Sequence, residues 1–274
     1  MHYDVRMHIV HTVAPAVLIN TYFLAVCRSL LVVLAVVLPP SLCASERVLL
    51  MPVLQSKPFG WLDETGKAQG LYPDIVAALS RQTGLAIRVE VVPFARAAAV
   101  VASGSADATL MFRNAFTRGK VVEALVVFNT QQIVQMRPGL RIAGRGALVG
   151  MELGRLNGGC QELADDKSAA WRFQDLSSQE SGVRMLLAER IDGFCTVNES
   201  LLDALAGAGL EARFATAQRV VLASKPVWLM LSQNLSPELG ARLVRGMAEL
   251  QRSGELARIF KARLGSRYVL DLNR

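Results

Sequence analysis

The sequence has very little histidine, and what it has lies at the N-terminus. The three histidines are His2, His8 and His11, and none follows them. Catalysis by Ser-His or Cys-His pairs needs an imidazole, as do the metal sites that use histidine. These functions are excluded for a domain built from the rest of the chain. No catalytic residue, metal site or cofactor is expected.

Acidic residues are also in the minority. The chain has 30 lysines and arginines against 23 aspartates and glutamates, a formal net charge of +7, and only 6% aromatic residues. The basic residues are interspersed and do not alternate with aromatics, as a nucleic-acid surface would favour. No nucleic-acid partner is therefore expected. The charge balance favours a basic cleft that takes an anionic or zwitterionic small molecule.

The chain lacks an uninterrupted apolar run long enough to cross a membrane. Residues 29–38 form an apolar run that follows Arg28 and precedes two prolines, and small residues come next up to Ala44. This order is typical of a secretory signal peptide. We expect cleavage near Ala44, or alternatively after Cys43, and export to the periplasm.

Residues 1–27 are unusually long and apolar for the basic region of a signal. We interpret residues 1–44 as a signal peptide with a mis-annotated N-terminal extension, with translation starting near Leu24 or Val26. The alternative is an uncleaved anchor made from both apolar runs. It would place the charge of Arg28 in the bilayer, which costs a few kcal/mol. Lipidation of Cys43 is disfavoured because Leu42 is large for the preceding position.

Only two cysteines, Cys160 and Cys195, remain after residue 44. An even pair in an oxidising compartment is often a disulfide. Two buried thiols are the alternative. The spacing alone does not decide between them.

Two stretches of the chain share the same sequence pattern. Residues 98–107 and 183–192 each read as the end of a helix, a tight turn and an aspartate, Asp107 or Asp192, followed by a short apolar strand. Such a junction is half of a right-handed βαβ unit. One junction in each half of the chain predicts two small α/β sheets. Small ligands bind at the carboxyl ends of such strands, so two facing sheets would share one crevice.

Strands and helices alternate along the rest of the chain. Expected strands cover residues 48–53, 87–92, 125–134, 147–153 and 220–231, with a turn at 63–66 and a loop at 154–159. Expected helices include residues 75–82, and a last pair that starts at the N-cap Ser236 and breaks at residues 253–255.

Four segments in this order resemble the periplasmic solute-binding proteins of the amino-acid ABC-transporter type, the bacterial extracellular solute-binding protein family 3. They are KPFGWLDETGKAQGLYPDIVAAL, VPFARAAAVVASGSADA, MLLAERIDGF and LSPELGARLVRGMAELQRSGELARIFKARLG. The resemblance covers residues 48–265. It implies an α/β, two-lobed type II fold in which two small mixed sheets are joined by two hinge strands.

The resemblance also implies how the chain is divided. Residues 45–136 would form the first part of lobe 1, residues 137–229 lobe 2, and residues 230–274 the C-terminal part of lobe 1. A ligand would be trapped as the lobes close. The expected partners are a small molecule and a membrane ABC permease, and the protein is expected to be a monomer.

In the family an arginine grips the ligand carboxylate after the strand that corresponds to residues 108–112. It lies in a Thr-x-x-Arg pattern, whereas here Thr117 is followed directly by Arg118. Arg118 is the first choice for this role and Arg113 the second, because a guanidinium can form a bidentate pair with a carboxylate. Either could instead be a solvated loop charge.

Other ligand positions depart from the family pattern. The stacking aromatic is missing, and Trp61 or Tyr72 could replace it, although both could equally be core residues. Arg155 stands where a small hydroxyl residue is usual. The carboxylate that would hold an α-ammonium is displaced to Asn198 and Glu199, with Val197 in its place. The aspartates Asp74, Asp107 and Asp192 are interpreted as structural.

Three functions follow. The first is a solute-binding protein that captures a small polar, amino-acid-like or carboxylate ligand and delivers it to an ABC transporter. The second is a sensing module that acts on a membrane receptor. The third is a dehydratase on the same scaffold, whose acid or base could only be Glu152, Glu199 or Lys225.

Overall fold

The computed structural model describes residues 47–156, 159–266 and 268–272. Residues 47–274 form one compact unit. The predicted signal peptide, its N-terminal extension and its cleavage site lie outside the described residues. None of the helices within the described ranges combines the length and the apolar character that crossing a bilayer requires.

The chain begins with the alternation of strands and helices that the sequence predicts. The elements are β1 (Leu49–Leu54), β2 (Trp61–Leu62), β3 (Ala68–Gln69), α2 (Leu71–Thr83), β4 (Ile87–Val92), α3 (Phe94–Ala102) and β5 (Ala108–Met111). β1 and β4 pair in parallel, and β2 and β3 form a small hairpin. The side chain of Asp63 accepts hydrogen bonds from the backbone of Thr65 and Lys67, which explains the turn predicted at residues 63–66.

The second part of the chain is built in the same way. It contains β6 (Val121–Met136), the 3-10 helix η1 (Arg145–Leu148), β7 (Glu152–Leu156), α4 (Gln161–Ala164), β8 (Arg172–Leu176), α5 (Gln179–Leu187), β9 (Gly193–Val197), α6 (Asn198–Gly207), α7 (Glu211–Phe214), β10 (Arg219–Ser232), α8 (Pro237–Arg252) and α9 (Glu255–Leu264).

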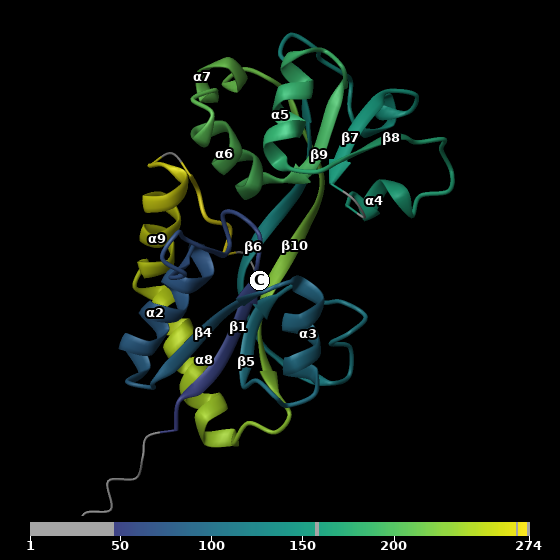
Figure 1. Cartoon of the computed structure of the whole chain (residues 1–274). Helices are drawn as coiled ribbons and strands as arrows, with labels where there is room; N and C mark the ends of the chain where they lie inside the picture. The colour runs from purple at the N-terminus through teal and green to yellow at the C-terminus, as the bar shows by residue number, and fades with distance from the viewer. Residues whose placement is uncertain (1–46, 157–158, 267, 273–274) are drawn as a thin grey trace, which may run out of the picture. The chain divides into compact units, whose positions relative to one another are not determined.

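Two long strands, β6 and β10, connect the parts of the fold. They pair antiparallel along their whole length, with three register irregularities. The resulting sheet has six strands in the order β5-β10-β6-β9-β7-β8 (Figure 1). The expected mixed α/β architecture with two connecting strands is present, and only the division into two small sheets differs in detail. Because β6 and β10 stay paired across three register irregularities, strands from both parts belong to one mixed sheet, whereas β1 with β4 and β2 with β3 form two-stranded sheets apart from it.

The buried hydrophobic side chains of the described residues gather in four clusters. Two of them involve β1, β4, β5, α2, α3 and α8, and the other two involve β7, β9, α5 and α6. β6 contributes to both groups, with Phe128 in the first and Ile133 in the second. A strand that enters two cores in turn is the geometry expected of a hinge strand.

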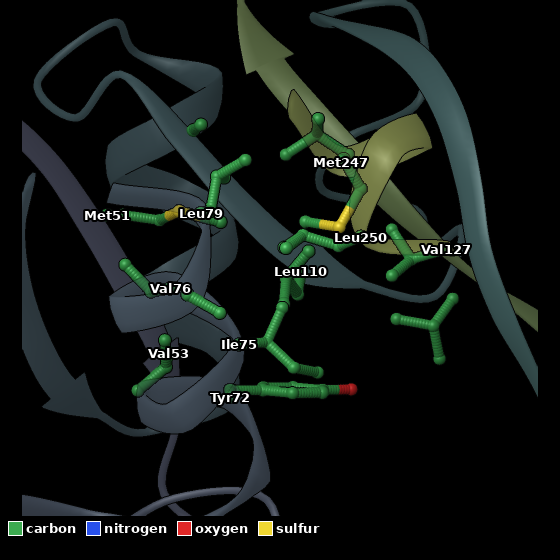
Figure 2. Close-up of a cluster of buried hydrophobic side chains, with 14 of the residues drawn as sticks. Met51, Val53, Tyr72, Ile75, Val76, Leu79, Leu110, Val127, Met247 and Leu250 are labelled. Atoms are coloured by element: carbon green, nitrogen blue, oxygen red, sulfur yellow. The ribbon is translucent and has the colours of Figure 1, made fainter. Parts of the chain in front are cut away.

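In the largest cluster, α2 packs against α8, a helix from the other end of the sequence. Ile75 and Leu79 of α2 pack with Met51 of β1 and with Met247 and Leu250 of α8 (Figure 2). Burying one such side chain stabilises a fold by about 1.5–3 kcal/mol. α8 begins where the sequence predicts it, with the Ser236 hydroxyl accepting a hydrogen bond from the Leu239 amide.

One predicted strand and loop are misplaced. The strand expected at residues 147–153 begins only at Glu152, and Gly154 and Arg155, expected in the following loop, lie inside β7. A Cβ atom on Gly154 would lie 2.6 Å from Ile191 Cδ1 and 2.8 Å from Leu176 Cδ1. Close packing inside the sheet therefore requires glycine at this position, and the residue does not form a turn.

Candidate functional site

A cavity of about 630 Å³ opens beside the two long strands. Its lining comes from the start of α3, the end of β5, the middle of β6 and β10, the start of α4 and the end of β9. The lining residues are Phe94, Phe112, Arg113, Thr130, Gln132, Gly159, Cys160, Gln161, Val197, Lys225 and Pro226. Elements from both groups of core clusters therefore contribute to one cavity of the size typical for a small ligand.

Arg113 supplies one cation to the cavity. Its Nε donates to Glu123 Oε2 at 2.6 Å, and its guanidinium lies 4.5 Å from the centre of the Trp228 ring. The carboxylate and the aromatic ring fix the direction of this side chain. The side chain is nevertheless 62% exposed, so the other N–H groups of its fork remain accessible.

Lys225 supplies the second cation. It lies in β10 and forms an ion pair with Glu162 of α4. Glu162 is only 12% exposed, and its Oε2 is buried without a hydrogen-bond partner among the described residues. Each cation at the cavity is therefore already matched by an internal carboxylate.

The neutral polar groups of the cavity come mainly from β6. The Thr130 hydroxyl donates to Glu199, and Gln132 Nε2 donates to the carbonyl oxygen of Thr196 at 3.3 Å. Gln132 stands opposite Val197 in the β6–β9 register. Phe94, Phe112, Val197 and Pro226 make much of the remaining lining apolar.

A disulfide joins Cys160 and Cys195, whose Cα atoms are 5.8 Å apart. Of the two alternatives left open by the sequence, the structure has the bonded one. The bridge ties the start of α4 to β9, and Cys160 itself lines the cavity. It therefore holds α4, with Gln161 and Glu162, against the sheet.

Glu199 is buried, 1% exposed, and does not line the cavity. It accepts hydrogen bonds from Thr130 and from the Tyr268 hydroxyl, the latter at 2.5 Å. Burial raises the pKa of the Glu199 carboxyl above its ordinary value, although the two hydrogen bonds act in the opposite direction. The residue links α6, β6 and the C-terminal segment.

The structure brings only one of the predicted ligand residues to this cavity, Arg113. Arg118 is exposed on the loop after β5, and no ion pair joins it to another described residue. Asn198 accepts a hydrogen bond from Arg219 at 3.3 Å and is not part of the lining.

The remaining predicted residues lie elsewhere. Tyr72 is a core residue, 1% exposed, and packs 5.2 Å from the Phe59 ring. The ring of Trp61 contacts the cationic groups of Lys57 and Arg263, which lie 5.5 and 5.2 Å from its centre. Arg155 pairs with Asp175 at 2.8 Å and stacks on Phe173.

Sequence reasoning missed most of the residues that line the cavity. Thr130 and Gln132 lie on one side of β6, two residues apart, as the period of a strand requires. The sequence predicts Lys225 and Pro226 within the strand at residues 220–231 and offers Lys225 only as an acid or base of a dehydratase, not as a ligand residue. The four polar residues 129–132, which interrupt the apolar stretch at residues 125–134, are a usable signal, although they do not give the register against β9 and β10.

The acid and base candidates of a dehydratase are not gathered here. Glu199 is buried, Glu152 pairs with Arg172, and only Lys225 lines the cavity. No group of three or more histidine, cysteine or acidic side chains suited to a metal ion occurs in the described part of the chain.

Comparison with known proteins gives a family match over most of the chain. Residues 51–266 match the model of "Bacterial extracellular solute-binding proteins, family 3". No curated protein sequence matches at a significant level.

Many solved structures share the fold. The second substrate-binding domain of an amino-acid ABC transporter from Streptococcus pneumoniae has a TM-score of 0.61 and 17% identity, over 80% of this chain and all of that one. The arginine-, lysine-, histidine-binding protein ArtJ from Geobacillus stearothermophilus has a TM-score of 0.59 and 17% identity, over 80% and 95%.

A histidine kinase sensor domain described as similar to periplasmic binding proteins also resembles this structure, with a TM-score of 0.61 and 17% identity. The match covers 80% of this chain and 96% of that one. At these identities the likeness concerns the fold, which is the mixed α/β fold of type II periplasmic binding proteins.

Proposed function

Because the chain belongs to the bacterial extracellular solute-binding proteins, family 3, we propose that it captures a small ligand in the cavity beside β6 and β10 and delivers it to an ABC transporter. This family consists of binding proteins that do not catalyse a reaction. The structural relatives named as parts of amino-acid transporters support a transport role.

The observation that carries the proposal is the composition of the cavity wall. Arg113 and Phe112 follow β5, Gly159 lies just before α4, Gln161 begins α4, and Val197 ends β9. A ligand that contacts both groups of elements gains binding energy only when they approach one another. Its differential affinity for the closed arrangement would shift the protein to that state.

We place the hinge in β6 and β10, with residues 45–136 and 230–274 as lobe 1 and residues 137–229 as lobe 2. Arg113 is proposed as the residue that holds an anionic group of the ligand. Its accessible guanidinium and its fixed direction support this assignment over Arg118. An exported location, with removal of the residues up to Ala44, is part of the same proposal.

A screen by thermal shift tests the function. The purified protein is heated with single amino acids, small carboxylates and polyamines. A compound at 100 times its Kd should stabilise the fold by about 2.7 kcal/mol, a clear rise in Tm. If no small molecule in a broad screen raises Tm, ligand capture in this cavity is contradicted.

A sensing role is the second candidate, because a sensor domain of a histidine kinase shares the fold at a TM-score of 0.61. Uptake of the identified ligand by cells with and without the protein separates the two. Loss of uptake supports transport. Unchanged uptake together with a lost transcriptional response supports sensing.

A further inference from the structure

Three acidic residues contact residues of the lining, and each is engaged by internal partners. Glu123 accepts from Arg113, Glu162 pairs with Lys225, and Glu199 accepts from Thr130 and Tyr268. Among the described residues that line the cavity, none is acidic. The second oxygen of Glu162 has no hydrogen-bond partner among the described residues, and it is buried from solvent.

This arrangement is unfavourable for a ligand that carries an ammonium group. Moving an ammonium ion from water into a largely apolar cavity is unfavourable unless a carboxylate receives it. The two charged side chains of the lining, Arg113 and Lys225, are cationic and cannot receive an ammonium group. The cavity can therefore hold the carboxylate of an amino acid, but it has no carboxylate among its described lining residues that receives the ammonium.

The same lining suits a carboxylate attached to an apolar body. The guanidinium of Arg113 offers a planar fork for a carboxylate. Phe94, Phe112 and Val197 offer apolar surface, and Gln132 offers a neutral hydrogen-bonding side chain. A cavity of about 630 Å³ has room for a ring or a branched chain.

We propose that the ligand is a carboxylate with an apolar body and no ammonium group. This inference rests on the proposed function, since it names the chemical class that the cavity would capture. It separates this chain from relatives whose names describe amino-acid binding.

Matched pairs of compounds test the inference on the unaltered protein. Isothermal titration compares 3-phenylpropionate with phenylalanine, and 4-methylpentanoate with leucine, which differ only in the amino group. We expect the compound without the amino group to bind at least tenfold more tightly in at least one pair. Equal or tighter binding of the amino acids would overturn the inference while leaving solute capture intact.

A change of one lining residue tests the physical reason. Val197→Asp places a carboxylate in the lining. It should raise the ratio of the affinity for the amino acid to the affinity for the matched compound without the amino group at least tenfold. Val197→Asn is the matched control, of nearly equal size but uncharged, and should leave the ratio unchanged. An unchanged ratio in a folded Val197→Asp protein would contradict the charge argument.

The failure of the inference and that of the function differ in outcome. If amino acids bind and the deaminated compounds do not, only the inference fails. If neither class binds and the broad screen raises no Tm, the proposed function fails and the inference fails with it.

Discussion

Asp107 and Asp192 make the same pair of contacts at equivalent places in the fold. Asp107 Oδ2 accepts from the Leu50 amide at 2.8 Å, and the Asp107 amide donates to the Leu50 carbonyl oxygen at 2.9 Å. Asp192 does the same with Glu152, at 3.1 and 2.8 Å. The repeated sequence pattern therefore reflects a repeated junction between strands, and both aspartates are structural, as the sequence predicted.

Replacing Asp107 by alanine should destabilise the fold. Asp107 is 8% exposed, and its loss leaves the Leu50 amide without its side-chain acceptor and Arg47 without its 2.6 Å partner. We expect a loss of about 1–3 kcal/mol in the free energy of unfolding, measured by urea denaturation. Asp74→Ala is the control: its ion pair with Arg263 is half-exposed and should contribute less than about 1 kcal/mol. Equal losses in the two variants would contradict the structural role of Asp107.

Reduction of the Cys160–Cys195 disulfide should also lower stability. The bridge closes a loop with a sequence separation of 35 residues. The chain-entropy model assigns such a loop about 4 kcal/mol of stabilisation at 25 °C. Denaturation with and without a phosphine reductant measures the difference. A Cys160→Ala/Cys195→Ala protein should be insensitive to the reductant, and equal sensitivity would point to another cause.

Glu199 should make stability depend on pH. Its pKa is raised above the ordinary value of 4.5 by burial. The folded protein therefore holds this proton at pH values where the unfolded chain has released it, so its contribution to stability falls as pH rises through and above about 4.5.

Glu199→Gln removes the titration while keeping an acceptor for Tyr268. We expect the free energy of unfolding of the wild type, minus that of the variant, to decrease between pH 4 and the raised pKa of the native state. Urea denaturation at a series of pH values measures it. A difference that is constant or that rises with pH would refute the assignment.

Much of the fold follows from local sequence patterns. The strands β1, β4 and β10 and the helix α8 appear where alternation and capping predict them, because these signals lie within each element. The mistake at Gly154 has a different origin. The side chains of Ile191 and Leu176 leave no room for a Cβ atom at this position. Both residues lie far along the chain, so the local pattern suggested a loop.

The cavity was less accessible to sequence reasoning for the same reason. Which side chains of β6 face it depends on pairing with β9 and β10, including the irregular register of β10. Arg113 and Arg118 both follow β5, and the sequence offered no way to know that Glu123 and Trp228 hold the first at the cavity. The sequence predicts that Glu199 contacts a ligand. Its actual partners, Thr130 and Tyr268, are each 69 residues away along the chain, so no local pattern indicates them.

The affinity of Arg113 and Arg118 variants for one ligand tests the central claim most directly. Isothermal titration compares the wild type, Arg113→Ala and Arg118→Ala with the best anionic compound from the thermal-shift screen. The account predicts at least a tenfold loss of affinity, about 1.4 kcal/mol, for Arg113→Ala and no change for Arg118→Ala. Unchanged affinity in Arg113→Ala, with or without a loss in Arg118→Ala, would contradict the placement of the binding site in this cavity.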